Sequence, residues 1–75
     1  MLCVAFPDNL VDARIACALR TLGAEVALAV DAREAARNRD VAVLLVDARA
    51  DEHRAVSAAR ALAAEIEIGW TVFVV

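Results

Sequence analysis

Two aspartates each follow a short apolar run of the sequence, and their placement makes them the strongest candidates for chemistry. Asp8 comes shortly after residues 2–6, and Asp47 directly follows residues 41–46. If these runs form neighbouring strands of a parallel sheet, both carboxylates lie at its carboxyl edge, where open α/β sheets bind ligands. Converging carboxylates repel each other unless a cation is bound or one is protonated, so the pair is a candidate Mg²⁺ site.

Each aspartate also has an ordinary structural role open to it. Asp8, or Asn9 beside it, is a residue type that commonly caps the start of a helix. Asp47 can accept backbone hydrogen bonds in the turn after its strand. The residues alone leave the paired site and these separate roles open.

The other nucleophilic and metal-binding residue types are too few and too scattered for a catalytic centre. Cys3 and Cys17 have no C-x-x-C spacing, and we expect both to be small buried hydrophobic residues, not metal ligands. His53 is the only histidine and Ser57 the only serine, so no nucleophile has an evident base, and no Gly-rich phosphate loop is present. We therefore expect that the chain is not an enzyme, and we assign His53 no role.

Composition narrows the classes of partner. The chain has 75 residues, of which 63% are hydrophobic, and a net charge of -3. This charge argues against nucleic acid as the main partner, because phosphate neutralisation needs clustered positive charge. The first residues have no basic segment of the kind that opens a signal peptide, and no apolar run is long enough for a membrane span. We therefore expect a cytoplasmic domain with no membrane partner.

Apolar runs alternate with amphipathic segments along the whole chain. Gly23 and an Asp31–Glu34 capping box mark helix boundaries. The expected strands cover residues 2–6, 25–30, 41–46 and 70–75, and the expected helices run from Asp8 or Asn9 to Leu22, from Asp31 to near Asn38, and over 51–66. This β-α-β-α-β-α-β order predicts a single α/β domain over residues 1–75, with a parallel sheet in strand order 2-1-3-4 and helices on both faces.

The apolar spacing also predicts which side chains face the core. In the first helix these are Leu10, Val11, Ile15, Ala18, Leu19 and Leu22, and in the third they are Val56, Ala59, Leu62, Ala63 and Ile66. Residues 41–46 read as a strand buried on both faces, whereas Glu65, Glu67 and Gly69 read as a turn before the last strand. That last strand has no polar face and no helix after it, so we expect residues outside this chain, a second copy or a partner to cover it.

Four segments resemble the receiver domains of bacterial response regulators. They are residues 4–14 (VAFPDNLVDAR), 19–26 (LRTLGAEV), 29–36 (AVDAREAA) and 43–49 (VLLVDAR). The resemblance implies a flavodoxin-like fold and places Asp47 at the phosphoacceptor position. It further implies that Asp8, Asp47 and the backbone carbonyl of Arg49 are the ligands of a weakly held Mg²⁺.

The departures from the receiver pattern concern its chemistry. Pro7 stands where the family has its first acidic residue, and the second helix is several residues short. The chain ends before the segments that carry the family's Ser/Thr, its Lys and its last two helices. All eight cationic residues are Arg, so the chain contains no Lys to steady a phosphoryl group. Phosphoryl transfer depends on positioning and charge stabilisation, so we expect it to be impaired.

The resemblance therefore implies a degenerate receiver, or the N-terminal portion of one, such as those inside hybrid histidine kinases. Its expected work in a two-component system is docking to a histidine kinase or another signalling domain, in cis or in trans, with a homo-oligomer through the last strand as a further expectation.

Two alternatives remain open. Arg49, Arg54, Arg60 and Trp70 could bind a cyclic dinucleotide through guanidinium groups and a stacking ring, or these arginines could simply be solvated and Trp70 could pack on a neighbour. Asp47 could also be a true phosphoacceptor that residues outside this chain complete.

Overall fold

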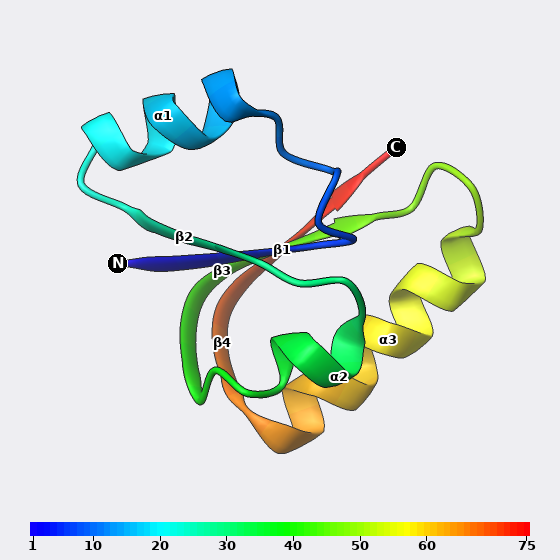
Figure 1. Ribbon diagram of the computed structural model, residues 1–75. Coiled ribbons are helices and arrows are strands. Elements are labelled where there is room, and N and C mark those ends of the chain that lie inside the picture. The colour runs from blue at the N-terminus through cyan, green and yellow to red at the C-terminus, as the bar shows by residue number, and fades with distance from the viewer.

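Strands and helices alternate along the chain in the order that the sequence predicts (Figure 1). The computed structural model describes all 75 residues, Met1–Val75. Its elements are β1 (Leu2–Phe6), α1 (Ala13–Thr21), β2 (Glu25–Leu28), α2 (Ala32–Ala35), β3 (Asp40–Asp47), α3 (Glu52–Glu65) and β4 (Glu67–Val74).

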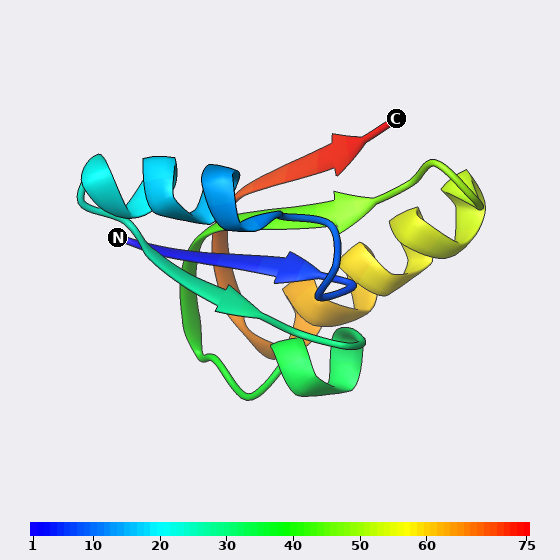
Figure 2. The same ribbon diagram turned by 45° about the horizontal axis from the view of Figure 1, so that its top comes forward.

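The four strands form one sheet in the order β2-β1-β3-β4, and every neighbouring pair is parallel. Figure 2 shows the four arrows running in the same direction. The register places Phe6 of β1 beside Val46 of β3, so these two strands end together. The predicted strand order and the flavodoxin-like arrangement are confirmed.

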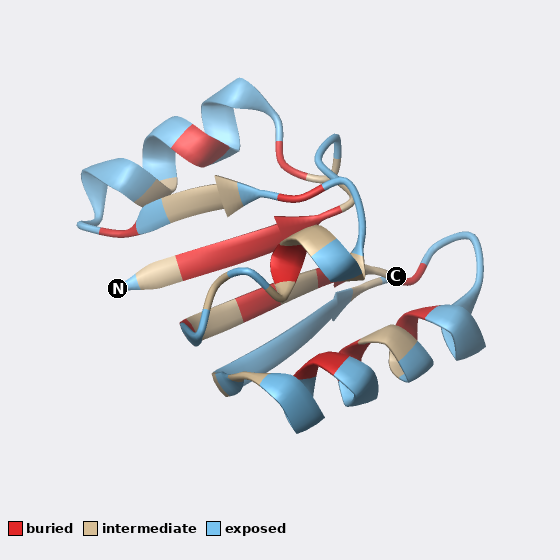
Figure 3. Ribbon diagram, turned by 60° about the horizontal axis from the view of Figure 1, so that its bottom comes forward, coloured by how far each residue is buried: buried red, intermediate tan, exposed pale blue.

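The helices cover the two faces of the sheet unequally. α2 and α3 lie on one face and α1 alone on the other (Figure 1). The larger core lies under α2 and α3, where strand side chains such as Val4 and Leu44 pack with helix residues such as Ala59 and Leu62. The core under α1 contains only three buried residues, Ala5, Val11 and Ala16. Figure 3 shows β1 buried along most of its length and β4 exposed along most of its length.

Helix α1 begins later than predicted. Its N-cap is Asp12, whose Oδ1 accepts a hydrogen bond of 2.9 Å from the Ile15 N–H, so the prediction of Asp8 or Asn9 is wrong. The preceding segment forms a turn in which the Leu10 N–H donates to the Pro7 carbonyl, 3.0 Å away. This turn allows Val11 to pack with Ala5 and Ala16 before the helix starts. The helix ends at the predicted place, since Gly23 follows its C-cap with φ +90°.

The inward stripe predicted for α1 is mostly wrong. Of its residues only Val11 is buried, whereas Ile15 remains 48% and Leu22 80% exposed. The helix buries Ala16 instead. An alanine at the contact lets the helix lie close to the sheet, and the larger residues then project past it.

Other boundaries differ by a few residues. β2 ends at Leu28, and α2 is a single turn that ends at Ala35, although its N-cap Asp31 is as predicted. In α3, Ala59 and Leu62 are buried as predicted. Ala55 is also buried, which was not predicted. Of the other residues predicted to face the core, Val56 and Ile66 are half-buried and Ala63 is exposed. β3 is fully buried only on the α3 side, since Val43 and Leu45 are half-buried.

β4 extends back into residues that read as a turn. It begins at Glu67, so Glu67 and Gly69 belong to the strand. Gly69 is needed there because a Cβ at this position would lie 2.7 Å from the Ala42 carbonyl oxygen of β3. The glycine therefore marks a close approach of two strands. In the sequence, such a glycine looks the same as one that forms a turn.

The cysteine prediction is half right. Cys3 is buried in β1 as expected, whereas Cys17 is exposed on α1.

We expect Asp12→Ala to destabilise the domain by about 1 kcal/mol, because it removes the side chain that caps α1. Asp8→Ala is the matched control, and its free energy of unfolding should stay within about 0.5 kcal/mol of the wild type, as for an ordinary surface change. Urea unfolding followed by circular dichroism measures both. A larger loss for Asp8→Ala than for Asp12→Ala would contradict the observed cap.

Candidate functional site

The carboxyl ends of β1 and β3 form the candidate site. These strands are neighbours, and the chain leaves β1 toward α1 on one face and β3 toward α3 on the other (Figures 1 and 2). This divergence is the switch point at which open α/β sheets bind ligands. Asp8 lies two residues after β1, and Asp47 is the last residue of β3, so the structure places both at this edge.

Arg49 holds the Asp47 carboxylate on both of its oxygens. The Arg49 backbone N–H and side-chain Nε–H each donate to Oδ1 over 2.9 Å, and a terminal N–H donates to Oδ2 over 3.0 Å. The Asp47 side chain is only 18% exposed, whereas that of Arg49 is 57% exposed. The predicted backbone hydrogen bond to Asp47 is therefore present, together with a two-pronged ion pair that the sequence analysis did not predict.

The ion pair changes the acidity of Asp47. Hydrogen bonds from the Arg49 side chain, and then from its backbone, lower the pKa of the Asp47 carboxyl from its ordinary 3.8 to about 2. Asp47 in turn raises the pKa of the Arg49 guanidinium. Asp47 is thus a carboxylate at neutral pH, and Arg49 already compensates its charge with two hydrogen bonds to Oδ1 and one to Oδ2.

Asp8 is exposed, and no hydrogen bond or ion pair joins its side chain to Asp47. No group of three or more His, Cys, Asp or Glu side chains is arranged to hold a metal ion. A Mg²⁺ on Asp8, Asp47 and the Arg49 carbonyl would compete with the Arg49 guanidinium for the Asp47 oxygens. The residues fit a divalent cation poorly while Arg49 is paired with Asp47.

A cleft of about 550 Å³ opens beside Asp47, between the ends of β1 and β3 and the starts of α2 and α3. Asp31 and Asp51 line it, but each is engaged as the N-cap of a helix. Arg54 contributes the one cationic side chain of the lining. The walls otherwise include Phe6, Pro7, Val30, Ala32, Val46, Ala50, Ala55 and Ala58.

The four residues considered for a cyclic dinucleotide are not brought together. Arg49 is paired with Asp47, and Arg54 and Arg60 lie on α3. Trp70 is paired in register with Val43 of β3, on the face opposite α3. No observation therefore favours this alternative.

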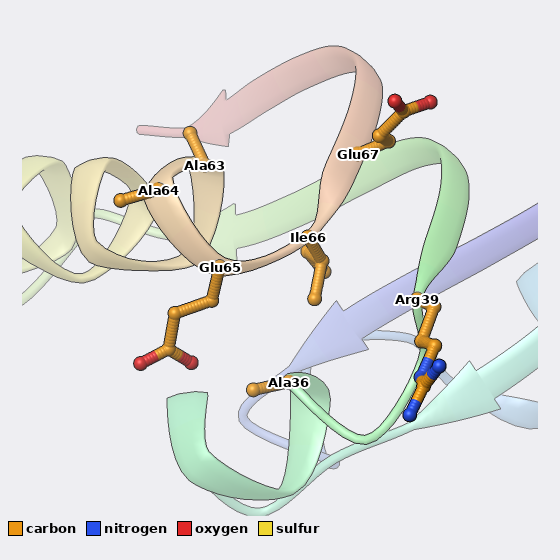
Figure 4. A pocket seen from close by; sticks show the side chains of 7 residues that line it. All are labelled: Ala36, Arg39, Ala63, Ala64, Glu65, Ile66 and Glu67. Carbon is orange, nitrogen blue, oxygen red and sulfur yellow. The ribbon is translucent and has the colours of Figure 1, made fainter.

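A second hollow, of about 610 Å³, lies at the other end of the strands, where β3 and β4 begin. It is bounded by the segment after α2 and by the end of α3. Figure 4 shows that its charged side chains, Arg39, Glu65 and Glu67, point in different directions around Ile66. They form no convergent set of ligands, so the hollow has no evident chemistry.

Comparisons with known protein families, with curated proteins and with solved structures gave no match. None of the helices is long and apolar enough to cross a membrane.

The ion pair that organises the site has a local signal in the sequence. Asp47 and Arg49 are two residues apart at the end of a strand, where alternate side chains share a face and a turn can bring both polar ends together. The resemblance implied that the Arg49 carbonyl binds the metal, and the guanidinium was considered only for a nucleotide, whereas it pairs with Asp47.

We expect the NMR signal of the Asp47 carboxyl carbon to titrate with a midpoint of about 2. In Arg49→Ala the midpoint should return toward 3.8, because the donors of the side chain are gone. A lowered pKa favours the folded state above pH 3.8, and this contribution is lost as the pH falls from 3.8 to about 2. Arg54→Ala is the control and should leave the midpoint unchanged; an unchanged midpoint in Arg49→Ala would show that the ion pair does not form.

Proposed function

We propose that this chain is a receiver-like signalling domain that works by docking to a histidine kinase or another signalling domain, with phosphoryl transfer to Asp47 impaired. The observation that carries the proposal is the position of Asp47. It closes the central strand β3 at the switch point of a sheet in the order 2-1-3-4, and Arg49 holds both carboxylate oxygens.

The ion pair accounts for the impaired chemistry. A carboxylate attacks phosphorus with an oxygen lone pair, and each Asp47 oxygen already accepts a hydrogen bond from the Arg49 guanidinium. The closed pair also competes with Mg²⁺, which would stabilise the charge of the transferred phosphoryl group. Pro7 supplies no carboxylate, and the chain has no Lys.

Docking is the function that remains once transfer is impaired. The loops after β1 and β3 lie at one edge and expose Asp8 and Arg49 to solvent. A partner that approaches this edge meets an acidic and a basic side chain on adjacent loops. Opposite charges at such a surface favour one orientation of the partner over others.

The test is phosphorylation by acetyl phosphate with Mg²⁺, followed by mass spectrometry of the intact chain. We expect no adduct on the wild type, and an adduct on Pro7→Asp/Arg49→Ala, because this variant restores a carboxylate and frees Asp47. Adding Asp47→Asn to that variant should abolish the adduct and serves as the control.

Two outcomes would count against the proposal. A stable, stoichiometric adduct on wild-type Asp47 would make the chain a true phosphoacceptor. The absence of any adduct on the double variant would remove the support for a receiver-like site.

A further inference from the structure

One face of the sheet carries an uncovered apolar stripe, which we call the β4 stripe and define as Val43, Leu45, Trp70 and Val72. Leu45 packs against the small core under α1, so it lies on the face of that helix. Trp70 is in register with Val43, and Val72 with Leu45, so all four share this face. Trp70 is 76% and Val72 44% exposed, and the stripe has no charged residue.

The exposed area of the molecule is larger than its mass requires. The chain exposes 5133 Å², whereas a compact monomer of 8.0 kDa exposes about 4,450 Å². The radius of gyration, 11.3 Å, is that of a compact domain of this length, about 11 Å. The molecule thus exposes about 700 Å² more than a compact monomer of its mass, and Trp70 and Val72 of the β4 stripe are among its large exposed apolar side chains.

The stripe adjoins an unprotected edge of the sheet. β4 pairs only with β3, and between Ile68 and Val74 it has neither a charged side chain nor a proline, the features that usually block pairing with another strand. The Val74 carbonyl accepts from Ala48 on the β3 side, 2.8 Å away. Backbone groups alternate along a strand, so those of Thr71 and Phe73 point outward, away from β3.

We propose that the chain forms a homodimer in which the β4 strands of two copies pair antiparallel across a two-fold axis at Thr71. This register uses the outward backbone groups of Thr71 on both copies. It sets Trp70 opposite Val72 of the second copy, an aromatic residue against a β-branched one on the same face, which is a favourable cross-strand pair.

The opposite face fits the same register. Phe73 of one copy lies opposite Gly69 of the other, so the ring meets no side chain at that position. The stripes of the two copies become continuous across the new junction. A second copy also meets no charge within β4 from Ile68 to Val74, whereas an acidic or basic partner would find no complementary group there.

Sedimentation equilibrium of the 75-residue chain tests the proposal independently of phosphorylation. We expect a dimer for the wild type and a monomer for Val72→Lys, because the charge would be buried opposite Trp70 of the second copy. Leu28→Lys is the matched control. Leu28 lies on the opposite edge strand β2, and its exposed fraction, 41%, is similar to the 44% of Val72. This variant should remain dimeric.

A second variant tests the strand pairing itself. Thr71→Pro removes an N–H that points away from β3, so the monomer should keep its circular dichroism spectrum while the dimer is lost. A monomeric wild type, or a Thr71→Pro variant that folds and stays dimeric, would overturn the proposal. Dimers of Val72→Lys as tight as those of the wild type would do the same.

Discussion

The pairing of β1 with β3 is the contact on which the rest of the structure depends. These strands supply Val4 and Leu44, which are fully buried, and their side-by-side alignment sets the order of the whole sheet. Parallel strands need a crossover, and the right-handed rule then fixes the faces on which the helices lie. The same alignment brings the chain segments that follow Phe6 and Val46 to one edge, although they are distant in sequence.

The unequal covering of the sheet follows from the composition of the helices. Alanine dominates the buried positions of α1 and α3, so each helix lies close to the sheet but buries little side-chain area. Two helices together complete a core on one face. On the other face α1 reaches Ala5 but leaves Trp70 exposed, so apolar surface there stays in contact with solvent.

The sequence predicts well the features that repeated or strongly apolar patterns encode. The strand order, β1, the cap of α2 at Asp31 and the stop of α1 at Gly23 all follow from such patterns. The start of α1 does not, because Asp8, Asn9 and Asp12 are all good capping residues and only the packing of Val11 decides between them. Gly69 was misread for a similar reason: its role depends on β3, which pattern analysis of one segment does not see.

The candidate site shows how a local contact can replace a long-range one. In the receiver-like arrangement, the charge of Asp47 would be balanced through a cation that Asp8 helps to hold, which requires two loops to converge. Arg49 lies two residues after Asp47 and balances that charge within one turn. The site then no longer depends on a carboxylate at the end of β1, and a proline at position 7 carries no electrostatic penalty. Pro7 and Arg49 are therefore consistent with each other: Arg49 balances the charge of Asp47 at an edge where Pro7 adds no second carboxylate.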